Sequence, residues 1–435
     1  MDVVTVLILS AILTFFATNR FSEWMNVAAA SQPVPAQLQE IYQPDHHQRS
    51  RDYLKQTAIY EFIKNFSALV CVLAFWFVGG FAAADNLLRS FGLSTLVGGT
   101  IFVVSYVLLI DLLKVPFYLY KLKIDREFGV GKTTPALFFV DYAKNFIGRL
   151  VMLPLPVFGI LWIFEKMGSQ SFLYVWLFVS VCGVFIQDVF LPLLAPLFNK
   201  YRSLEDGEIR TAVAEYAKRV NFRFKDIVVV DTSQRTAVAG AFLRGFGNSK
   251  SIVLNDNLIR SVSRDEMVAA VALAIGRDRF DNWFLGLIGT VGMIGIMFYL
   301  MSLFIWEPGI FRAFGVQQSV YLGLVFFSLV FPPVELGFSI VRNYMSRRTQ
   351  AKADAFAAST TGNPDSVISA LKKLSVTSLA NLTPHPAYVL LNHAKPPLAQ
   401  RLQSIAGTRY SSAATEAKDF TDPPSLPREA SSRAS

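Results

Sequence analysis

Few residues in this chain are of a type and spacing that would hold a metal ion. In the zinc motif His-Glu-x-x-His, two imidazoles four residues apart share one helix face, and the glutamate between them activates a metal-bound water. The 435 residues include only four histidines. His46 and His47 are adjacent, and His385 and His393 lie late in the chain, so no pair has the motif's spacing. We expect no metal site from them.

The two cysteines, Cys71 and Cys182, fall inside long apolar segments. Neither a disulfide framework nor a thiolate metal site is expected from two thiols in that setting, so they are interpreted as packing residues.

The composition is that of a membrane protein. Hydrophobic residues make up 53% of the chain and aromatic residues 14%, and the mean hydropathy is +0.40. A soluble core of this size does not need so much apolar surface, so the chain is predicted to be polytopic. Segments long enough to cross roughly 30 Å of hydrocarbon number about seven. They lie at about residues 3–18, 66–84, 93–113, 146–164, 171–195, 284–305 and 320–341.

Polar residues mark two of these segments. Asp111 and Lys114 end the third, and either interior pairing or a simple helix end explains them. Asp188, beside Gln187 and deeper in the fifth segment, is expected to face a polar interior.

Basic residues predict the orientation of the bundle. Lys and Arg concentrate in the loops after the first and third segments, in residues 197–282 and beyond Arg342. The positive-inside rule then predicts a lumenal N-terminus and a cytosolic C-terminus. The net charge of +9 follows from this asymmetry and from anionic lipid at the cytosolic face, so no nucleic-acid partner is expected.

The domain organisation follows from these segments. Residues 1–196 are assigned to five membrane helices with cytosolic loops, and residues 283–341 to two more. Between them, residues 197–282 are predicted to form a cytosolic α+β domain, with a helix at 208–220, strands at 226–231 and 252–254 in a hairpin-like unit, and a helix whose Ser263 and Glu266 have capping-box spacing. Residues 342–406 are predicted to form a helical cytosolic region, and residues 407–435 a disordered tail.

Several runs of residues resemble the integral-membrane CAAX prenyl endopeptidases (type 1, a-factor-converting), zinc metalloproteases that trim prenylated C-terminal tails. The most specific is Pro196-Leu-Phe-Asn-Lys-Tyr201, followed by Leu204-Glu-Asp-Gly-Glu208. The resemblance implies an all-α polytopic membrane protein whose helices enclose a water-filled chamber, with a small cytosolic α+β zincin-like insertion. It also implies the endoplasmic reticulum. Further segments agree with the family in order: 127–129 with 132–135, 228–231, 245–247, 252–254, 346–348, 353–356, 396–398 and 401–402.

The family's zinc chemistry is missing at the matching positions. The His, Glu and His of the motif correspond to Leu273, Ala274 and Arg277, and the third ligand, a glutamate, corresponds to Gln350. Leucine has no lone pair to donate, alanine has no carboxylate, and arginine is a permanent cation that repels Zn²⁺. The resemblance therefore implies a degenerate member without metal or cofactor.

At other family positions, some residues differ from those of the family and others are the same. The substrate-lining edge is matched by Gly240 and Phe242, and the late His-Pro-Pro by Lys395-Pro-Pro, while Asp354, which orients a zinc ligand in the family, and Arg401 remain. One hypothesis is that Arg277 occupies the metal position and pairs with Asp354 or a neighbouring acceptor. The alternative is that it reaches the surface beside Asp278 and Asp281.

Three functions are compatible with these observations. The first is a catalytically inactive homologue that scaffolds prenylated or membrane-inserted polypeptides, or regulates an active relative. The second is a CAAX-processing metalloendopeptidase. The third is a conduit for lipid or solute through the chamber, which would depend on Asp188 or Glu335.

Overall fold

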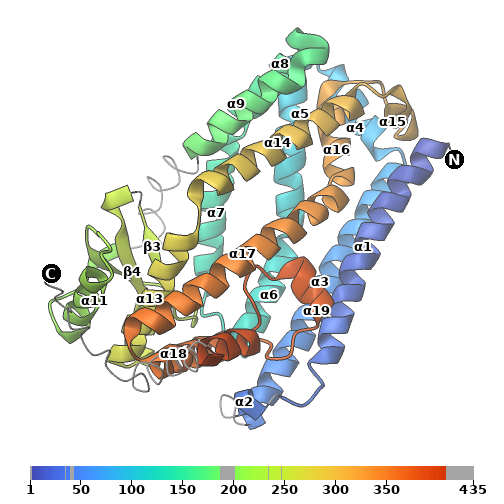
Figure 1. The fold of residues 1–435 in the computed structure, drawn as a ribbon. Helices are drawn as coiled ribbons and strands as arrows, with labels where there is room; N and C mark the ends of the chain where they lie inside the picture. The colour runs from blue at the N-terminus through green and yellow to red at the C-terminus, as the bar shows by residue number, and fades with distance from the viewer. Residues whose placement is uncertain are drawn as a thin grey trace, which may run out of the picture.

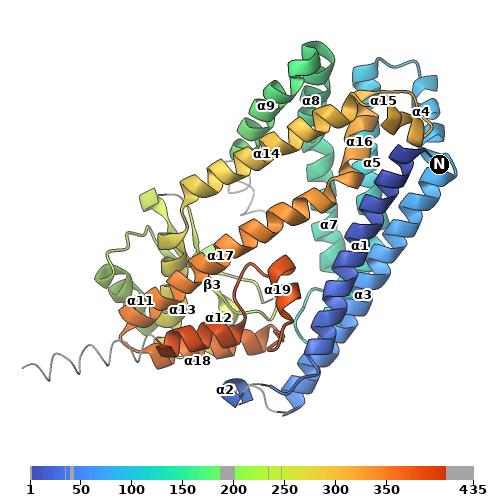
Figure 2. The same cartoon turned by 45° about the vertical axis from the view of Figure 1, so that its right-hand side comes forward.

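The computed structural model describes residues 2–34, 36–39, 44–186, 201–233, 235–245 and 247–407. Long helices form one end of the molecule, and a small sheet with its covering helices forms the other (Figure 1). The second view shows α14 (Trp283–Ile305) and α17 (Pro332–Thr361) running from the helical end to the sheet (Figure 2). These two helices therefore connect the membrane part to the domain that carries α13 (Arg264–Phe280).

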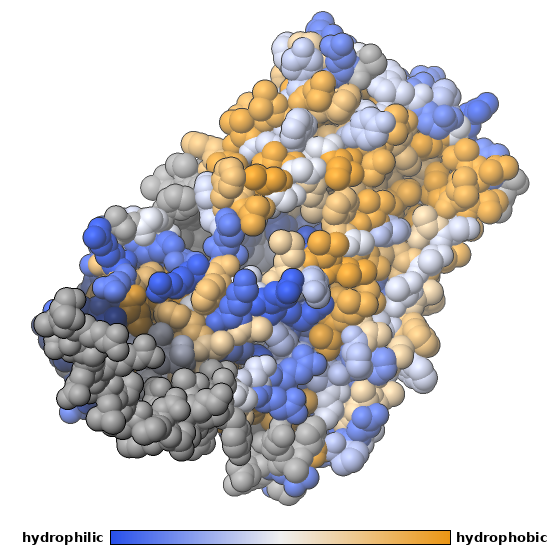
Figure 3. Space-filling view, in the orientation of Figure 1, coloured by the Kyte–Doolittle hydropathy of each residue, from blue (hydrophilic) through white to orange (hydrophobic). Residues whose placement is uncertain are grey.

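The helical end matches the expected polytopic membrane protein. By length and composition, five helical segments among the described residues could span a membrane, and a sixth span results if α16 (Val320–Val330) and α17, which bend by 54° at their junction, count as one. At most 22% of the residues in the most apolar window of each of the five segments are buried within the protein. Many of the remaining apolar side chains are exposed, and the face of the helical end in Figure 3 is largely orange, as expected of a surface that contacts lipid. The five segments are α1 (Val3–Ala29), α3 (Pro44–Phe77), α5 (Thr95–Leu113) with α6 (Val115–Glu127), α7 (Pro135–Met152) with α8 (Pro154–Met167), and α14.

The predicted count of seven spans is not confirmed. The span expected at 66–84 is wrong at its C-terminal end, because α3 stops at Phe77 and Gly79 adopts a left-handed φ of +80° before α4 (Gly80–Ser90) begins. Of the span expected at 171–195, the described part contains the apolar helix α9 (Ser171–Phe185). Gln187 and Asp188 lie outside the described residues.

An ion pair joins two membrane helices. Asp111 of α5 is buried and pairs with Arg149 of α7 at 2.5 Å. Asp111 is thus paired inside the protein, with Arg149 and not with Lys114, and it also lies in the last turn of α5. Lys114 caps the end of α5, and Glu335, in the first turn of α17, pairs with Arg342 at 3.8 Å.

The α+β domain contains a four-stranded sheet in the order β1-β2-β4-β3. The strands are β1 (Tyr201–Ser203), β2 (Ile227–Val230), β3 (Ala241–Arg244) and β4 (Ser251–Asn255). β2 and β4 are parallel, whereas β3 is antiparallel to β4 and forms one edge. The predicted hairpin-like unit is thus correct only for β3 and β4, because two parallel strands need a crossover between them.

Locally encoded elements of this domain match their predictions. α11 (Glu208–Arg219) fills the predicted amphipathic helix, and β2 and β4 coincide with the two predicted strands. α13 begins with the predicted capping box, in which Ser263 and Glu266 exchange side chain to backbone hydrogen bonds. The zincin-like character of the insertion is not established by these elements alone.

Helices from the end of the chain complete this domain. α13 packs between α11, α17 and α18 (Pro364–Thr377), and its residues dominate the main buried cluster. α17 continues without interruption across the suggested boundary between residues 341 and 342. Except for Gly407, the predicted tail lies outside the described residues. The remaining elements are α2 (Ala36–Gln39), α12 (Asp256–Ser261), α15 (Pro308–Ala313), α19 (Pro386–Asn392), the short 3-10 helices Gly168–Gln170 and Gly247–Ser249, and a helix at 398–407.

A membrane-side loop is paired with the segment that leads into the edge strand β3. Lys132 donates its backbone N–H to Arg235 O at 3.0 Å, and Ala237 donates to Val130 O at 2.9 Å. The Arg235 side chain reaches Asp141 of α7 at 3.1 Å. The α+β domain is therefore fixed to the membrane helices near the start of β3.

Candidate functional site

The positions that correspond to the zinc motif lie where α13 packs closely against α17. A Cβ atom at Gly276 would lie 2.9 Å from both the Ala353 carbonyl oxygen and the Phe356 ring. Only glycine permits this approach of the two helices. Leu273 is buried, and Arg277, one turn later, is half-buried. Residues four apart share one helix face, so Leu273 and Arg277 both lie on the face of α13 that contacts α17.

Arg277 begins a chain of polar contacts that runs through α17. Its guanidinium donates to Gln350 Oε1 at 2.9 Å and to Ser346 Oγ at 3.2 Å. Gln350 Nε2 in turn donates to Asp354 Oδ1 at 2.9 Å. Arg401, from the helix at 398–407, closes the chain with two hydrogen bonds to Asp354, from Nε at 2.8 Å and from Nη2 at 2.7 Å. We refer to Arg277, Gln350, Asp354 and Arg401 as the relay.

The relay is deeply buried at its centre. Asp354 is 1% exposed and Gln350 is 4% exposed. A carboxylate in such a place needs a cation and full hydrogen bonding, and the Arg401 fork supplies both. The carboxamide of Gln350 accepts from one side and donates to the other, so it links the Arg277 cation to the carboxylate without a direct ion pair.

The two interpretations of Arg277 are thereby distinguished. The guanidinium reaches an acceptor next to Asp354, namely Gln350, as the first interpretation stated. It does not turn towards Asp278, whose carboxylate pairs with Lys250 at 2.6 Å. Asp354 is therefore connected to Arg277 through one side chain.

The residues at these positions do not fit a zinc ion. Leu273 and Ala274 offer no donor atom, Arg277 is a cation, and the Gln350 amide oxygen already accepts a hydrogen bond from Arg277. Within the described ranges, no group of three or more His, Cys, Asp or Glu side chains is arranged to hold a metal. The side chains at these four positions therefore do not support a reaction step through a bound metal.

The expected substrate-lining residues lie on the sheet edge. Gly240 directly precedes β3, and the Phe242 side chain on this strand is 42% exposed. Among the described residues, β3 packs against α13 and pairs with the strand β4 on one side. The edge of a sheet is where an extended peptide can add as a further strand.

Lys395 lies near the relay, in the loop before the helix at 398–407. Desolvation lowers the pKa of its ammonium group, and the nearby Arg401 and Arg277 charges lower it further, whereas Asp354 raises it. Three predicted residues, Lys395, Arg401 and Asp354, are thus brought near Arg277, while Gly240 and Phe242 lie on the separate β3 edge.

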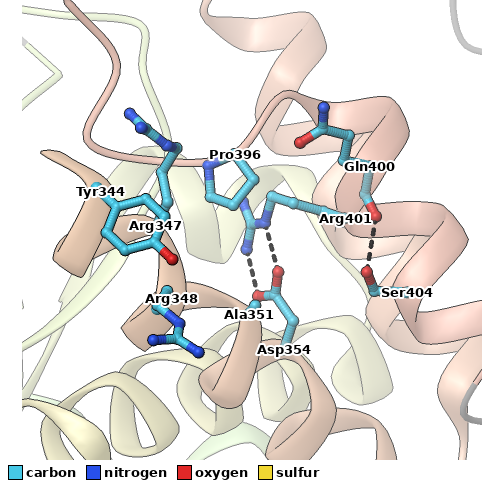
Figure 4. A pocket seen from close by; sticks show the side chains of 9 residues that line it. All are labelled: Tyr344, Arg347, Arg348, Ala351, Asp354, Pro396, Gln400, Arg401 and Ser404. Atoms are coloured by element: carbon cyan, nitrogen blue, oxygen red, sulfur yellow. Dashed lines mark hydrogen bonds and ion pairs between the residues drawn. The ribbon is translucent and has the colours of Figure 1, made fainter. Parts of the chain in front are cut away.

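Sequence reasoning missed two features of this region. The first is a pocket of about 250 Å³ between α17 and the helix at 398–407, in which Arg401 points at Asp354 below Pro396 (Figure 4). Consecutive arginines at 347 and 348 were a visible signal for it. The pocket is lined by Tyr344, Arg347, Arg348, Ala351, Asp354, Pro396, Gln400, Arg401 and Ser404.

The second missed feature surrounds Glu266 at the start of α13. Beyond the capping bond, its carboxylate accepts from Ser369 Oγ at 2.5 Å and from Lys373 Nζ at 2.6 Å. Desolvation alone would raise the pKa of Glu266, but the hydrogen bonds from Lys373, Ser369 and the Ser263 N–H outweigh it and lower the pKa to about 2.

Comparison with known proteins establishes the family. The model for the CAAX prenyl protease N-terminal part, with five membrane helices, matches residues 23–200, and that for peptidase family M48 matches residues 203–409. The CAAX prenyl protease 1 homolog of Oryza sativa subsp. japonica is 30% identical over 67% of this chain and 69% of its own length. The chain belongs to the CAAX prenyl protease 1 family.

Other relatives extend the similarity over most of the molecule. The CAAX prenyl protease 1 homolog of Arabidopsis thaliana is 28% identical over 86% of this chain and 90% of its own length. Among solved structures, S. mikatae Ste24p superposes with a TM-score of 0.86 over 93% of this chain and 99% of that chain, at 22% identity. At this identity the structural likeness establishes the Ste24p fold for this family member.

Proposed function

We propose that this CAAX prenyl protease 1 family member binds prenylated or membrane-inserted polypeptides without hydrolysing them. The observation that carries the proposal is the relay, two of whose members, Arg277 and Gln350, stand at positions where the resemblance implies zinc ligands. Arg277 contributes a fixed positive charge there and is already hydrogen-bonded to Gln350 and Ser346. A guanidinium does not activate water as a bound Zn²⁺ does.

The residue at the motif's general-base position supports the same conclusion. The motif's catalytic glutamate corresponds to Ala274. Three carboxylates on or against this helix are engaged: Glu266 with Lys373, Asp278 with Lys250, and Asp354 with Arg401. A general base must reach the proton that it removes, and these three groups have other partners.

Features for binding a chain remain in the molecule. The β3 edge and the exposed Phe242 could align an extended peptide.

The decisive experiment measures zinc content and peptide cleavage together. We expect the purified chain to contain substoichiometric zinc and to leave a farnesylated CAAX peptide intact while binding it. A control variant carrying Leu273→His, Ala274→Glu, Arg277→His and Gln350→Glu together should gain zinc. Stoichiometric zinc with turnover in the unaltered chain would overturn the proposal.

A second candidate function is CAAX-box processing by a metalloendopeptidase. The specific observation in its favour is that the relatives named above are CAAX prenyl proteases that match most of this chain. The same experiment separates the two candidates, because processing requires both bound metal and a cleaved product.

We further propose the cellular setting that the sequence predicts. The N-terminus is lumenal and the C-terminus cytosolic in the endoplasmic reticulum membrane, where an active relative is a candidate partner. Protease protection of tags at the two termini in sealed microsomes tests the orientation.

A further inference from the structure

A loop from the membrane part pairs with the segment that leads into the edge strand β3. The loop comprises residues 129–133 and joins α6 to α7. Gly131 in this loop forms an antiparallel β-bridge with Thr236, and one backbone hydrogen bond flanks the bridge on each side. The loop thus acts as a short additional strand just before β3.

The direction of the backbone groups shows which side of this segment faces β4. Successive residues of an extended strand direct their N–H and C=O groups to opposite sides. Thr236 O accepts from Asn257 Nδ2 at 2.7 Å, in the helix that follows β4. Gly240 O accepts from the Asn255 N–H of β4 at 3.0 Å. The even-numbered residues therefore face β4, and the odd-numbered residues face away from it.

The side that faces away from β4 is covered at its start and open further along. Arg235 and Ala237 bond to the 129–133 loop on this side. Ala241 and Leu243 of β3 direct their backbone groups to the same side, and among the described residues no strand pairs with them there. An extended polypeptide added to β3 would therefore lie in line with the loop.

The 129–133 loop is held in place from two directions. Val130 and Gly131 both donate their N–H groups to Asp125 O at 2.9 Å, near the end of α6. A Cβ atom at Gly131 would lie 2.8 Å from the Asp125 Cβ, so the loop packs closely on that helix. On the sheet side, the Arg235 guanidinium forms two hydrogen bonds with Asp141 of α7, at 3.1 and 3.3 Å. Such a fork fixes the two segments that it joins.

We propose that the 129–133 loop is a stop that makes the β3 edge selective for the C-terminal end of a polypeptide. The inference rests on the proposed binding function. An antiparallel pair of strands is slightly more stable per residue than a parallel pair. A chain antiparallel to β3 passes Arg244 first and Ala241 last, so its C-terminal end is directed at Val130 of the loop. An internal segment would have to continue through the loop, whereas a chain that ends there would not.

The open part of the edge suits a short C-terminal tail. β3 contains four residues, which correspond to about 13 Å of edge at roughly 3.3 Å per residue. In a CAAX sequence, three residues follow the prenylated cysteine, and this tail is shorter than the open edge. The tail can therefore pair with β3 along its whole length before it reaches the loop.

The test measures how farnesylated CAAX peptides bind to the full chain in detergent micelles, by fluorescence anisotropy. One labelled peptide ends at its ordinary C-terminus. A second has glycine-serine-glycine appended after that end, and a third has the same extension at its N-terminus. We expect the C-terminal extension to weaken binding about tenfold, because the chain must give up backbone hydrogen bonds to β3. The N-terminal extension should change the affinity by less than about twofold.

Variants of the Arg235–Asp141 pair test whether the loop is the stop. Arg235→Gln removes the ion pair, so the loop should yield and the discrimination between the two extensions should fall to about threefold. The double variant Arg235→Asp with Asp141→Arg reverses the pair and should restore discrimination. The matched control is Arg210→Gln, which removes an ion pair with Asp226 at the opposite edge of the sheet and should leave discrimination at about tenfold.

The possible failures are distinguishable. Equal effects of the two extensions would overturn this inference alone, because the peptides would still bind. Discrimination that is equal in Arg235→Gln and Arg210→Gln would overturn the role of the 129–133 loop. If none of the three peptides binds, the proposed binding function fails and the inference fails with it. Thermal unfolding of each variant, together with its affinity for the unextended peptide, shows that the variant is folded.

Discussion

The two ends of α13 hold buried charge in opposite ways. At its start, one anion, Glu266, is surrounded by the donors of Ser263, Ser369 and Lys373. At its end, the Arg277 cation is joined through Gln350 to a carboxylate on another helix. The first network begins as a local helix cap, whereas the second exists only because distant segments meet. The start of α13 is therefore stabilised in part by a cap that neighbouring residues encode, whereas its end depends on contacts with residues far away in the chain.

The largest expected effect comes from the centre of the relay. Asp354→Asn leaves the Arg401 guanidinium buried without a counter-charge, which should lower the free energy of unfolding by about 3–5 kcal/mol. Denaturant titration in detergent micelles measures this loss. The control is Asp206→Asn, since the Asp206 side chain is fully exposed although it pairs with Arg210. Similar losses in both variants would contradict the view that the relay is a buried network.

A smaller effect is expected where α13 and α17 meet. Gly276→Ala would place a methyl group 2.9 Å from the Ala353 carbonyl oxygen, and the helices would have to separate, at a cost of about 2–3 kcal/mol. Gly289→Ala in α14 serves as the control, because nothing lies within 4 Å of the added Cβ there. The same denaturant titration compares them. Stability equal in the two variants would show that the close approach is not needed.

At the other end of α13, Glu266→Gln tests the anion network and its pH dependence. Its loss should cost about 2 kcal/mol at neutral pH, less than the pKa shift alone implies, because Lys373 is partly exposed and screened. The folded pKa of about 2 lies below the ordinary 4.5, so this stabilisation is complete above pH 4.5 and is lost as the pH falls towards 2. The substitution should remove that part of the acid dependence from the unfolding curve. An unchanged slope between pH 2 and 4.5 would argue against the network.

The smallest effect is expected at the cap itself. Ser263→Ala removes the side chain that accepts from the Glu266 N–H at 3.4 Å, and N-cap losses cost about 1 kcal/mol. Ser263→Asp preserves an acceptor and should retain most of the stability. A loss as large as that of Asp354→Asn would remove the contrast between the two ends.

Elements encoded within a few residues were predictable. The capping box, the amphipathic α11 and the apolar strands β2 and β4 each follow from short patterns of spacing and residue type. The membrane spans were predictable as apolar helices, but the residues at which they begin and end were not. Gly79, which ends α3, lies within an apolar run where hydropathy does not change.

The site was predictable only as a set of residue types. That Leu273, Ala274, Arg277 and Gln350 lack the chemistry of zinc ligands can be read from their side chains. Their mutual contacts were not readable, because Arg277 and Gln350 are 73 residues apart, and Arg401 and Asp354 are 47 apart. Nor did the sequence indicate that Arg347 would be fixed by backbone oxygens while Arg348 stacks on Tyr344.

By itself, the sequence determined that this is a membrane protein with a small α+β domain. It also determined that side chains able to bind zinc are absent from the motif positions. Both conclusions rest on composition, periodicity and side-chain chemistry, which are local properties. The tertiary structure decided which partners the remaining charged side chains have. Burial makes an unpaired charge costly, so Arg277, Gln350, Asp354 and Arg401 satisfy one another only through the packing of α13, α17 and the helix at 398–407. The same packing places two further arginines, Arg347 and Arg348, in the lining of a pocket beside Asp354 and Arg401.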